Sequence, residues 1–255
     1  MDVFFSNLEP ATLFLACGVA VLAGVIKGMV GFGMPMVLIS GLSSFIAPEL
    51  ALAGLILPTL VTNGIQAFRQ GIQAAWQSVR RFRRFLFAGG LTMLVSAQFV
   101  RVLPSEIMLL IIGIPVSVFA ASQLLGRPIR IAKPSAGGEM AVGTVAGVLG
   151  GLSGVWGPPT VTYLTAIGTQ KEEQIRVQGV VYGLGALLLV GAHLGSGVLN
   201  AKTVPFSIAL IPPAILGMWV GGQISDRIDQ DLFRKATLLI LLLASLNLIR
   251  RGLLG

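Results

Sequence analysis

Residues 23–35 of the chain read AGVIKGMVGFGMP, and residues 146–158 read AGVLGGLSGVWGP. The two stretches align without a gap and share the skeleton Gly-x3-Gly-x2-Gly-x3-Pro. The first contributes Gly24, Gly28, Gly31 and Pro35, and the second contributes Gly147, Gly151, Gly154 and Pro158. Self-similarity of this kind indicates an internal duplication. We therefore predict two repeated halves, residues 1–135 and residues 136–255.

Long apolar runs extend from both motifs. The chain has 255 residues, of which 55% are hydrophobic and 11% are charged, whereas soluble domains average about 25% charged residues. A helix needs about 20 mainly apolar residues to span a bilayer. With five apolar segments in each half, we predict a polytopic α-helical membrane protein with 8–10 spans. The segments are 11–31, 34–47, 50–68, 85–100 and 105–125, then 140–155, 159–168, 177–195, 204–224 and 235–250.

The basic residues indicate how the chain crosses the membrane. The net charge of +8 resides mostly in short loops between apolar segments, where Lys and Arg mark the cytoplasmic side. This distribution argues against a nucleic-acid partner. With the stretch from Arg80 to Arg84 inside, thirteen Lys and Arg lie inside and four outside. Each half then crosses an odd number of times, so we expect the second half to be inverted and both termini to face outward.

The second segment of each half is short and follows directly on a break, GFGMP or GVWGPP. Such interrupted segments at corresponding places in two halves are typical of transporter binding sites. A half-helix that spans or re-enters from there would turn unpaired N–H groups and its positive dipole end toward an anion. We expect both starts to meet at one midplane anion site, although glycines used only for helix packing would give the same pattern. The candidate contacts are Gly31, Gly33, Met34, Gly154, Trp156, Gly157, Pro158 and Thr160.

Polar residues inside the apolar segments are further candidates. Lys27 lies one turn before the first break, and a charge at membrane depth costs about 2.5–3.5 kcal/mol on insertion scales. We predict that its ammonium pairs with the anion; the alternatives are snorkelling to an interface and capping of helix carbonyls. Four polar residues of segment 50–68 share one helical face, which could line a substrate site or join helices. These are Thr59, Thr62, Asn63 and Gln66, and the corresponding segment 177–195 of the second half supplies Gln178 and Tyr182.

The sequence lacks the motifs of other functions. It contains no Gly-x4-Gly-Lys-Ser/Thr stretch for a nucleotide and no His/Glu cluster for a metal, so we expect no enzyme activity, no cofactor and no metal site. Its carboxylates lie at segment ends, which favours an anionic substrate over a cation. A secondary transporter, an anion channel and a non-transporting scaffold subunit all stay open. The abundant small residues are compatible with a homodimer.

Two stretches resemble the sulfite exporter TauE/SafE family, also called YfcA-like or TSUP permeases. They are KGMVGFGMPMVLISGLSSFIAPELALAG (27–54) and GTVAGVLGGLSGVWGPPTVTYLTAIGTQKEEQIRVQG (143–179), and the resemblance covers nearly the whole chain. Lys27 stands where small residues are usual in that family. The resemblance implies a bacterial inner-membrane permease or exporter of a small sulfur-containing anion: sulfite, sulfoacetate, another organosulfonate or a related carboxylate. It also implies site roles for Gly31, Gly33, Gly154, Gly157 and Pro158.

Overall fold

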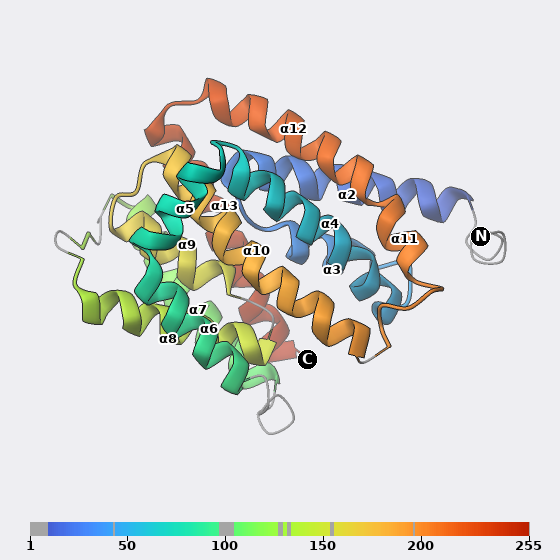
Figure 1. The fold of residues 1–255 in the computed structure, drawn as a ribbon, viewed down its shortest axis with the longest axis horizontal. Coiled ribbons are helices and arrows are strands. Elements are labelled where there is room, and N and C mark those ends of the chain that lie inside the picture. The colour runs from blue at the N-terminus through green and yellow to red at the C-terminus, as the bar shows by residue number, and fades with distance from the viewer. Residues whose placement is uncertain are drawn as a thin grey trace. The chain divides into compact units, whose positions relative to one another are not determined.

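The computed structural model of the chain describes residues 10–42, 44–96, 105–126, 130–131, 134–153, 156–195 and 197–254. Every regular element in these ranges is a helix, as the sequence predicted (Figure 1). The helices are α2 (Pro10–Val30), α3 (Met34–Leu42), α4 (Pro48–Phe68), α5 (Ile72–Arg81), α6 (Arg83–Ser96), α7 (Ser105–Leu124), α8 (Ala136–Ser153), α9 (Gly157–Ala166), α10 (Lys171–Gly195), α11 (Val204–Ala209), α12 (Ile211–Arg227) and α13 (Gln230–Leu254).

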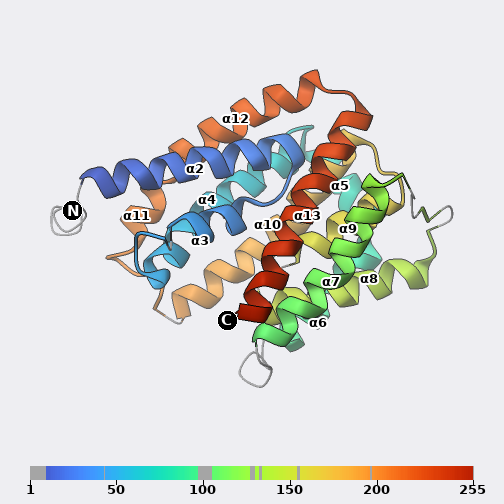
Figure 2. The ribbon, with the colours of Figure 1, turned by 180° about the vertical axis from the view of Figure 1, so that it is seen from behind.

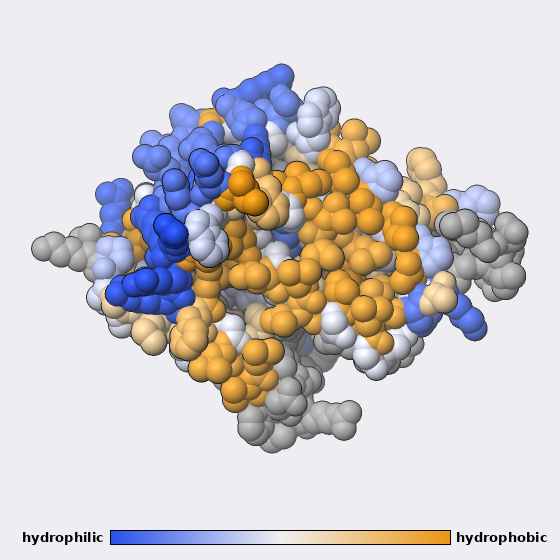
Figure 3. Space-filling model, in the orientation of Figure 1, coloured by the Kyte–Doolittle hydropathy of each residue, from blue (hydrophilic) through white to orange (hydrophobic). Residues whose placement is uncertain are grey.

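Several of these helices are suited to a membrane. Among the described residues, five helical stretches are long and apolar enough to cross one: Pro10–Val30, Leu50–Phe68, Lys171–Gly195, Val204–Arg227 and Gln230–Leu254. Large apolar side chains such as Phe14, Leu187 and Leu243 are exposed on them. The space-filling view likewise shows hydrophobic side chains on the surface (Figure 3). Because water would penalise such surfaces, lipid is the solvent that they fit.

The helix boundaries around the two breaks repeat at a constant spacing. The helices α2 and α8 end at Val30 and Ser153, α3 and α9 begin at Met34 and Gly157, and α4 and α10 begin at Pro48 and Lys171. Each pair is 123 residues apart, which is also the distance from Gly24 to Gly147. These helix boundaries thus recur at the spacing of the sequence motif, while the two repeated halves and the inversion of one of them stay predictions.

The helices form two compact units. Unit 1 contains Met1–Arg69 and Gly179–Asp229, and unit 2 contains Gln70–Gln178 and Gln230–Gly255. In unit 1, α2 packs along α12; in unit 2, α6 packs along α8 and α7 along α13 (Figures 1 and 2). In each of these pairs one helix comes from residues 1–135 and the other from residues 136–255. The predicted halves are therefore interleaved within both units.

Two glycines of the repeated skeleton permit this close packing. A Cβ placed on Gly24 would lie 2.8 Å from the Met218 backbone nitrogen and 3.0 Å from the Gly217 Cα of α12. On its counterpart Gly147, a Cβ would lie 2.7 Å from the Gly89 Cα of α6. Contacts this short leave no room for a side chain, so both glycines serve helix packing. The packing alternative raised by the sequence is correct for these two positions.

Helix α4 contains Pro58 in its middle, and a neighbouring helix supplies the hydrogen bond that the proline cannot form. Proline lacks the N–H that would donate to the carbonyl of Gly54. The buried Ser207 of α11 takes its place, because its Oγ donates to the Gly54 carbonyl oxygen over 3.2 Å. The same Oγ accepts a hydrogen bond of 3.2 Å from the Leu57 N–H. Ser207 therefore ties α11 to α4 within unit 1.

Three elements differ from the segments expected from hydropathy. The helix α5, whose buried side holds Ala75 and Ser78, occupies part of the basic stretch; hydrophilic side chains gather over it in Figure 3. Helix α10 begins six residues before the expected position 177, at Lys171. The segment 204–224 is interrupted at Leu210, where α11 ends and α12 begins. Charged first turns and short amphipathic helices escape a search for apolar runs, which explains the first two differences.

Candidate functional site

The first break lies in unit 1 between α2 and α3, and two glycines shape it. Gly31 has a φ of 85° and Gly33 a φ of 92°. Side chains rarely adopt such values, so glycine is required at both positions. The Gly31 N–H donates to the Lys27 carbonyl over 2.7 Å and closes α2, and the Val37 N–H donates to the Gly33 carbonyl over 3.1 Å and opens α3. The break therefore falls where the sequence predicted it.

Lys27 is buried beside this break. Lys27 is 2% exposed, and its Nζ donates to the Oδ1 of Asn63 on α4. The ammonium forms no ion pair with any residue that the structure describes. A buried charge without a counter-ion is costly. Asn63 is neutral, so its hydrogen bond leaves that charge uncompensated.

The four polar residues predicted to share a face of α4 are all buried, and three of them contact the break or Lys27. Gln66 donates from Nε2 to the Gly31 carbonyl over 3.0 Å. Thr62 donates to the Pro58 carbonyl over 2.6 Å, and its Oγ1 lies 3.3 Å from the Met34 sulfur. Asn63 receives the Lys27 hydrogen bond. Helix α4 therefore packs its polar face onto the start of α3.

Two donors on this face are not used within the described residues. The hydroxyl of Thr59 and the Nδ2 of Asn63 are buried and have no hydrogen-bond partner there. Buried polar groups are normally satisfied, and an unsatisfied one needs an explanation. Both groups can donate to an anion. Together with the N–H bonds of Lys27 that Asn63 does not accept, they form a set of donors without acceptors among the described residues.

Helix α10 approaches the same face of α4 through glycines that the sequence analysis missed. A Cβ on Gly179 would lie 2.5 Å from the Ala67 backbone nitrogen, and one on Gly183 would lie 3.8 Å from the Asn63 Cβ. The spacing Gly179-x3-Gly183 is the small-residue pattern of close helix pairs, and it could have been found in the sequence. The predicted Tyr182 lies between them in the chain and is buried, as is Gln178 one turn earlier.

The second break lies in unit 2 between α8 and α9. Its Gly154 is outside the described residues, and Trp156 is half-buried directly before Gly157, the first residue of α9. Pro158 and Pro159 occupy the first turn of the helix and are buried. Proline suits this turn, because its missing N–H would have had no partner within the helix. Thr160 donates its hydroxyl proton to the Trp156 carbonyl over 2.9 Å, so that proton is already engaged.

The predicted site residues thus form two groups. Unit 1 brings together Lys27, Gly31, Met34, Thr62, Asn63 and Gln66, with Gly33 in the same break and Thr59 one turn before Asn63. Unit 2 holds Trp156, Gly157, Pro158 and Thr160 at the start of α9, and Gln178 on α10. The first group can offer cationic and amide donors, and the second offers mainly the start of a helix.

Comparison with protein families gives a match over most of the chain. The family model described as "Sulfite exporter TauE/SafE" matches residues 16–248 of the chain. The match includes both breaks and all the candidate site residues. Searches of curated proteins and of solved structures found no match.

Proposed function

Since the chain belongs to the sulfite exporter TauE/SafE family, we propose that it moves a small sulfur-containing anion across the membrane as a secondary transporter. Membership makes it a multi-pass membrane transporter and not an enzyme. The substrates that we propose are sulfite, sulfoacetate or another organosulfonate. We further propose that it works in a bacterial inner membrane by alternating access, with two inverted repeats exchanging the exposure of the bound anion.

The observation that carries this proposal is the buried cation at the first break. Lys27 lies one turn before Gly31 at the first break, hydrogen-bonded to a neutral amide and not paired with a described carboxylate. An anion bound there would supply the missing counter-charge. The start of α3 adds N–H groups that have no partner within the helix, and the dipole favours negative charge at that end.

The neighbouring donors fit an anion with several oxygens. An ammonium has three N–H bonds, and only the one to Asn63 is used among the described residues. The Nδ2 of Asn63 and the hydroxyl of Thr59 add two further donors. A sulfonate group and the fully ionised sulfite anion each have three oxygens and no proton to donate, so a set of donors suits them. Gly31, Gly33, Met34, Thr62 and Gln66 hold these groups in place.

The same proposal includes the residues of the second break, on the strength of the sequence repeat. Trp156, Gly157 and Pro158 would present the start of α9 to the anion as Gly33, Met34 and Pro35 present that of α3. Thr160 would have to release the Trp156 carbonyl before it could donate to a ligand. Gln178 and Tyr182 are the proposed contributions of α10.

The ion pairs agree with the proposed topology, in which both termini lie outside. Arg69 binds Asp226 over 2.6 Å within unit 1, and Arg81 binds Glu173 over 2.6 Å within unit 2. Each pair joins two parts of the chain that the charge distribution assigns to the cytoplasmic side. Residues on opposite sides of a membrane could not form such pairs, so these contacts support the assignment.

The test compares Lys27→Met with the wild-type chain. Purified protein is titrated with sulfite, sulfoacetate and acetate, and counterflow of the bound anion is measured in liposomes. Because a charged hydrogen-bonding partner contributes roughly 1.5–3 kcal/mol, the variant should bind at least about tenfold more weakly. It should fold at least as well as the wild type, since it no longer buries a charge.

The matched control is Lys202→Met, which makes the same change at an exposed lysine of unit 1. It should keep wild-type affinity and counterflow. If Lys27→Met bound sulfur anions as tightly as Lys202→Met, Lys27 would have no part in the site. Uptake without stimulation by unlabelled anion on the opposite side would identify a channel instead of a carrier.

A further inference from the structure

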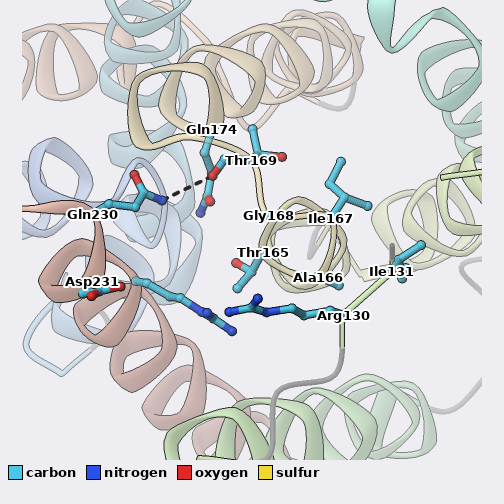
Figure 4. A pocket seen from close by; sticks show the side chains of 11 residues that line it. Arg130, Ile131, Thr165, Ala166, Ile167, Gly168, Thr169, Gln174, Gln230 and Asp231 are labelled. Carbon is cyan, nitrogen blue, oxygen red and sulfur yellow. Dashed lines mark hydrogen bonds between the residues drawn. The ribbon is translucent and has the colours of Figure 1, made fainter. Parts of the chain in front are cut away.

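A polar cavity lies wholly within unit 2, and none of the residues that line it belongs to the first break. Its volume is about 530 Å³. It is lined by the segment 130–131, the end of α9 with the loop that follows, and the starts of α10 and α13 (Figure 4). The polar residues that line it are Arg130, Thr165, Thr169, Gln174, Gln230 and Arg234, with the acidic Asp231. None of these residues belongs to the proposed transport site.

The charges of this cavity favour an anion. Two guanidinium groups, those of Arg130 and Arg234, line it together with the single carboxylate of Asp231. Arg130 forms neither a hydrogen bond nor an ion pair with a residue that the structure describes, and Figure 4 shows its side chain reaching toward the cavity below Thr165. Arg234 donates to the Gln123 Oε1, a neutral acceptor. One positive charge therefore remains in excess.

Two hydroxyl groups in the wall also lack acceptors. Thr165 is 7% exposed and Thr169 is 5% exposed, and neither Oγ1 has a hydrogen-bond partner among the described residues. Both residues line the cavity. Unsatisfied buried hydroxyls are unfavourable, and a bound group with acceptor oxygens would satisfy them. The hydroxyls and the guanidinium groups therefore both suit a ligand with acceptor oxygens.

Hydrogen bonds between the surrounding segments hold the cavity open before any ligand binds. The side chain of Gln230 joins two segments, because its Nε2 donates to the Thr169 carbonyl over 3.4 Å and its Oε1 accepts from the Lys171 N–H over 2.9 Å. The Ile131 N–H donates to the Ala166 carbonyl over 2.9 Å and fixes the segment that carries Arg130. A preformed cavity lowers the entropy lost on binding.

We propose that this cavity binds a phosphate group. Guanidinium groups and hydroxyls are the usual partners of phosphate oxygens. Two candidate membrane spans, Lys171–Gly195 and Gln230–Leu254, begin at the cavity. The ends of membrane spans lie at the depth of the lipid headgroups. The volume suits a headgroup-sized ligand. The phosphate can come from an anionic phospholipid or from free phosphate, and the experiment separates these sources.

The experiment uses native mass spectrometry of the delipidated full-length chain. Phosphatidylglycerol, phosphatidylcholine and inorganic phosphate are each titrated against the wild type and against Arg130→Gln, Thr165→Val and Arg84→Gln. The last variant is the control, because it removes an exposed arginine of unit 2 that does not line the cavity. Loss of one charged contact should weaken phosphatidylglycerol binding at least about tenfold in Arg130→Gln. Thr165→Val should weaken it severalfold, and Arg84→Gln should leave it unchanged.

The outcomes show whether the ligand is a lipid or free phosphate, and whether the proposal holds at all. Phosphatidylglycerol binding that inorganic phosphate cannot displace identifies a lipid site, and displacement by phosphate identifies a site for the free anion. Equal affinities of Arg130→Gln and Arg84→Gln would overturn the proposal, as would absence of binding by both phosphatidylglycerol and phosphate. Lys27→Met should bind phosphatidylglycerol like the wild type, so failure of the transport proposal would leave this result unchanged.

Discussion

The two breaks of the chain share their backbone pattern but differ in their side chains. The shift of 123 residues that aligns the motifs pairs Lys27 with Gly150, Asn63 with Ala186 and Gln66 with Leu189. At the first break the three polar side chains contact one another or the break itself. At the matching positions of the second, no side chain can form a hydrogen bond.

This difference separates what the repeat preserves from what it does not. Glycine and proline recur because both breaks need the same helix ends and the same close packing. The charge occurs once, so a single cationic group with its amide partner is available to recognise an anion. We infer that the side chains at the first break select for an anion, and that the second break contributes mainly backbone N–H groups at the start of a helix.

The largest effect is expected where the two breaks are alike, at the packing glycines. A Cβ at Gly24 or at Gly147 would overlap backbone atoms of the neighbouring helix. Since backbone cannot move aside as a side chain can, Gly24→Ala and Gly147→Ala should each lower the free energy of unfolding by about 3 kcal/mol or more. Thermal unfolding in detergent measures this loss.

Each of these variants has a control within the same unit. Nothing lies within 4 Å of a Cβ placed on Gly18 of α2 or on Gly90 of α6. Gly18→Ala and Gly90→Ala should leave the melting temperature unchanged or raise it, because alanine favours helix. If Gly147→Ala were as harmless as Gly90→Ala, the two breaks would not be packed alike.

The next effect concerns the polar contact found only at the first break. Asn63→Leu removes the acceptor of the Lys27 ammonium and leaves a buried charge without a partner. Stability should fall by about 1–3 kcal/mol, and sulfite affinity should fall as well. The double variant Lys27→Met/Asn63→Leu should recover stability but not binding. Titration and thermal unfolding of the three variants give both quantities.

The same substitution on α13 provides the control. Among the described residues, Asn247 accepts only an exposed hydrogen bond from Arg250, so Asn247→Leu should change neither property. A double variant that remained as unstable as Asn63→Leu would show that the lost hydrogen bond is not the cause. Recovery of binding in the double variant would remove both residues from the anion site.

A smaller effect is expected at Ser207, which compensates for a proline that only the first half contains. The position matching Pro58 is Val181. Ser207→Ala leaves the Gly54 carbonyl and the Leu57 N–H of α4 without their partner, and stability should fall by about 1–2 kcal/mol. Adding Pro58→Val restores the helix N–H to Gly54 and should reduce that loss. Equal losses with and without Pro58→Val would exclude the proposed repair.

The breaks were predictable from the sequence because their cause is local. Gly31 and Gly33 adopt positive φ values that few other residues tolerate, and Pro158 and Pro159 mark the first turn of a helix. The shared face of Thr59, Thr62, Asn63 and Gln66 also follows from helical spacing alone.

The partners of these residues were not predictable, because they are remote in the chain. Nothing near Gly24 indicates that it packs on Gly217, or that Ser207 repairs the helix around Pro58. The helix α5 was missed for a different reason. Its apolar and polar residues alternate around a short helix that ends in arginines, so its average hydropathy is low although Ala75 and Ser78 are buried.

The smallest expected effect is on sulfite affinity, and it compares a hydroxyl without a hydrogen-bond partner among the described residues with one that is already hydrogen-bonded. The Thr59 hydroxyl has no partner among the described residues, whereas the Thr160 hydroxyl donates to the carbonyl of Trp156, the residue directly before its helix. A ligand can use the first without breaking any bond. We therefore expect Thr59→Val to raise the dissociation constant for sulfite about fivefold, which corresponds to one hydrogen bond of roughly 1 kcal/mol. Thr160→Val should change it less than about twofold, because the exchange of one bond for another brings little net gain. A larger effect at Thr160 than at Thr59 would mean that the second break, and not the first, supplies the hydroxyl that holds the anion.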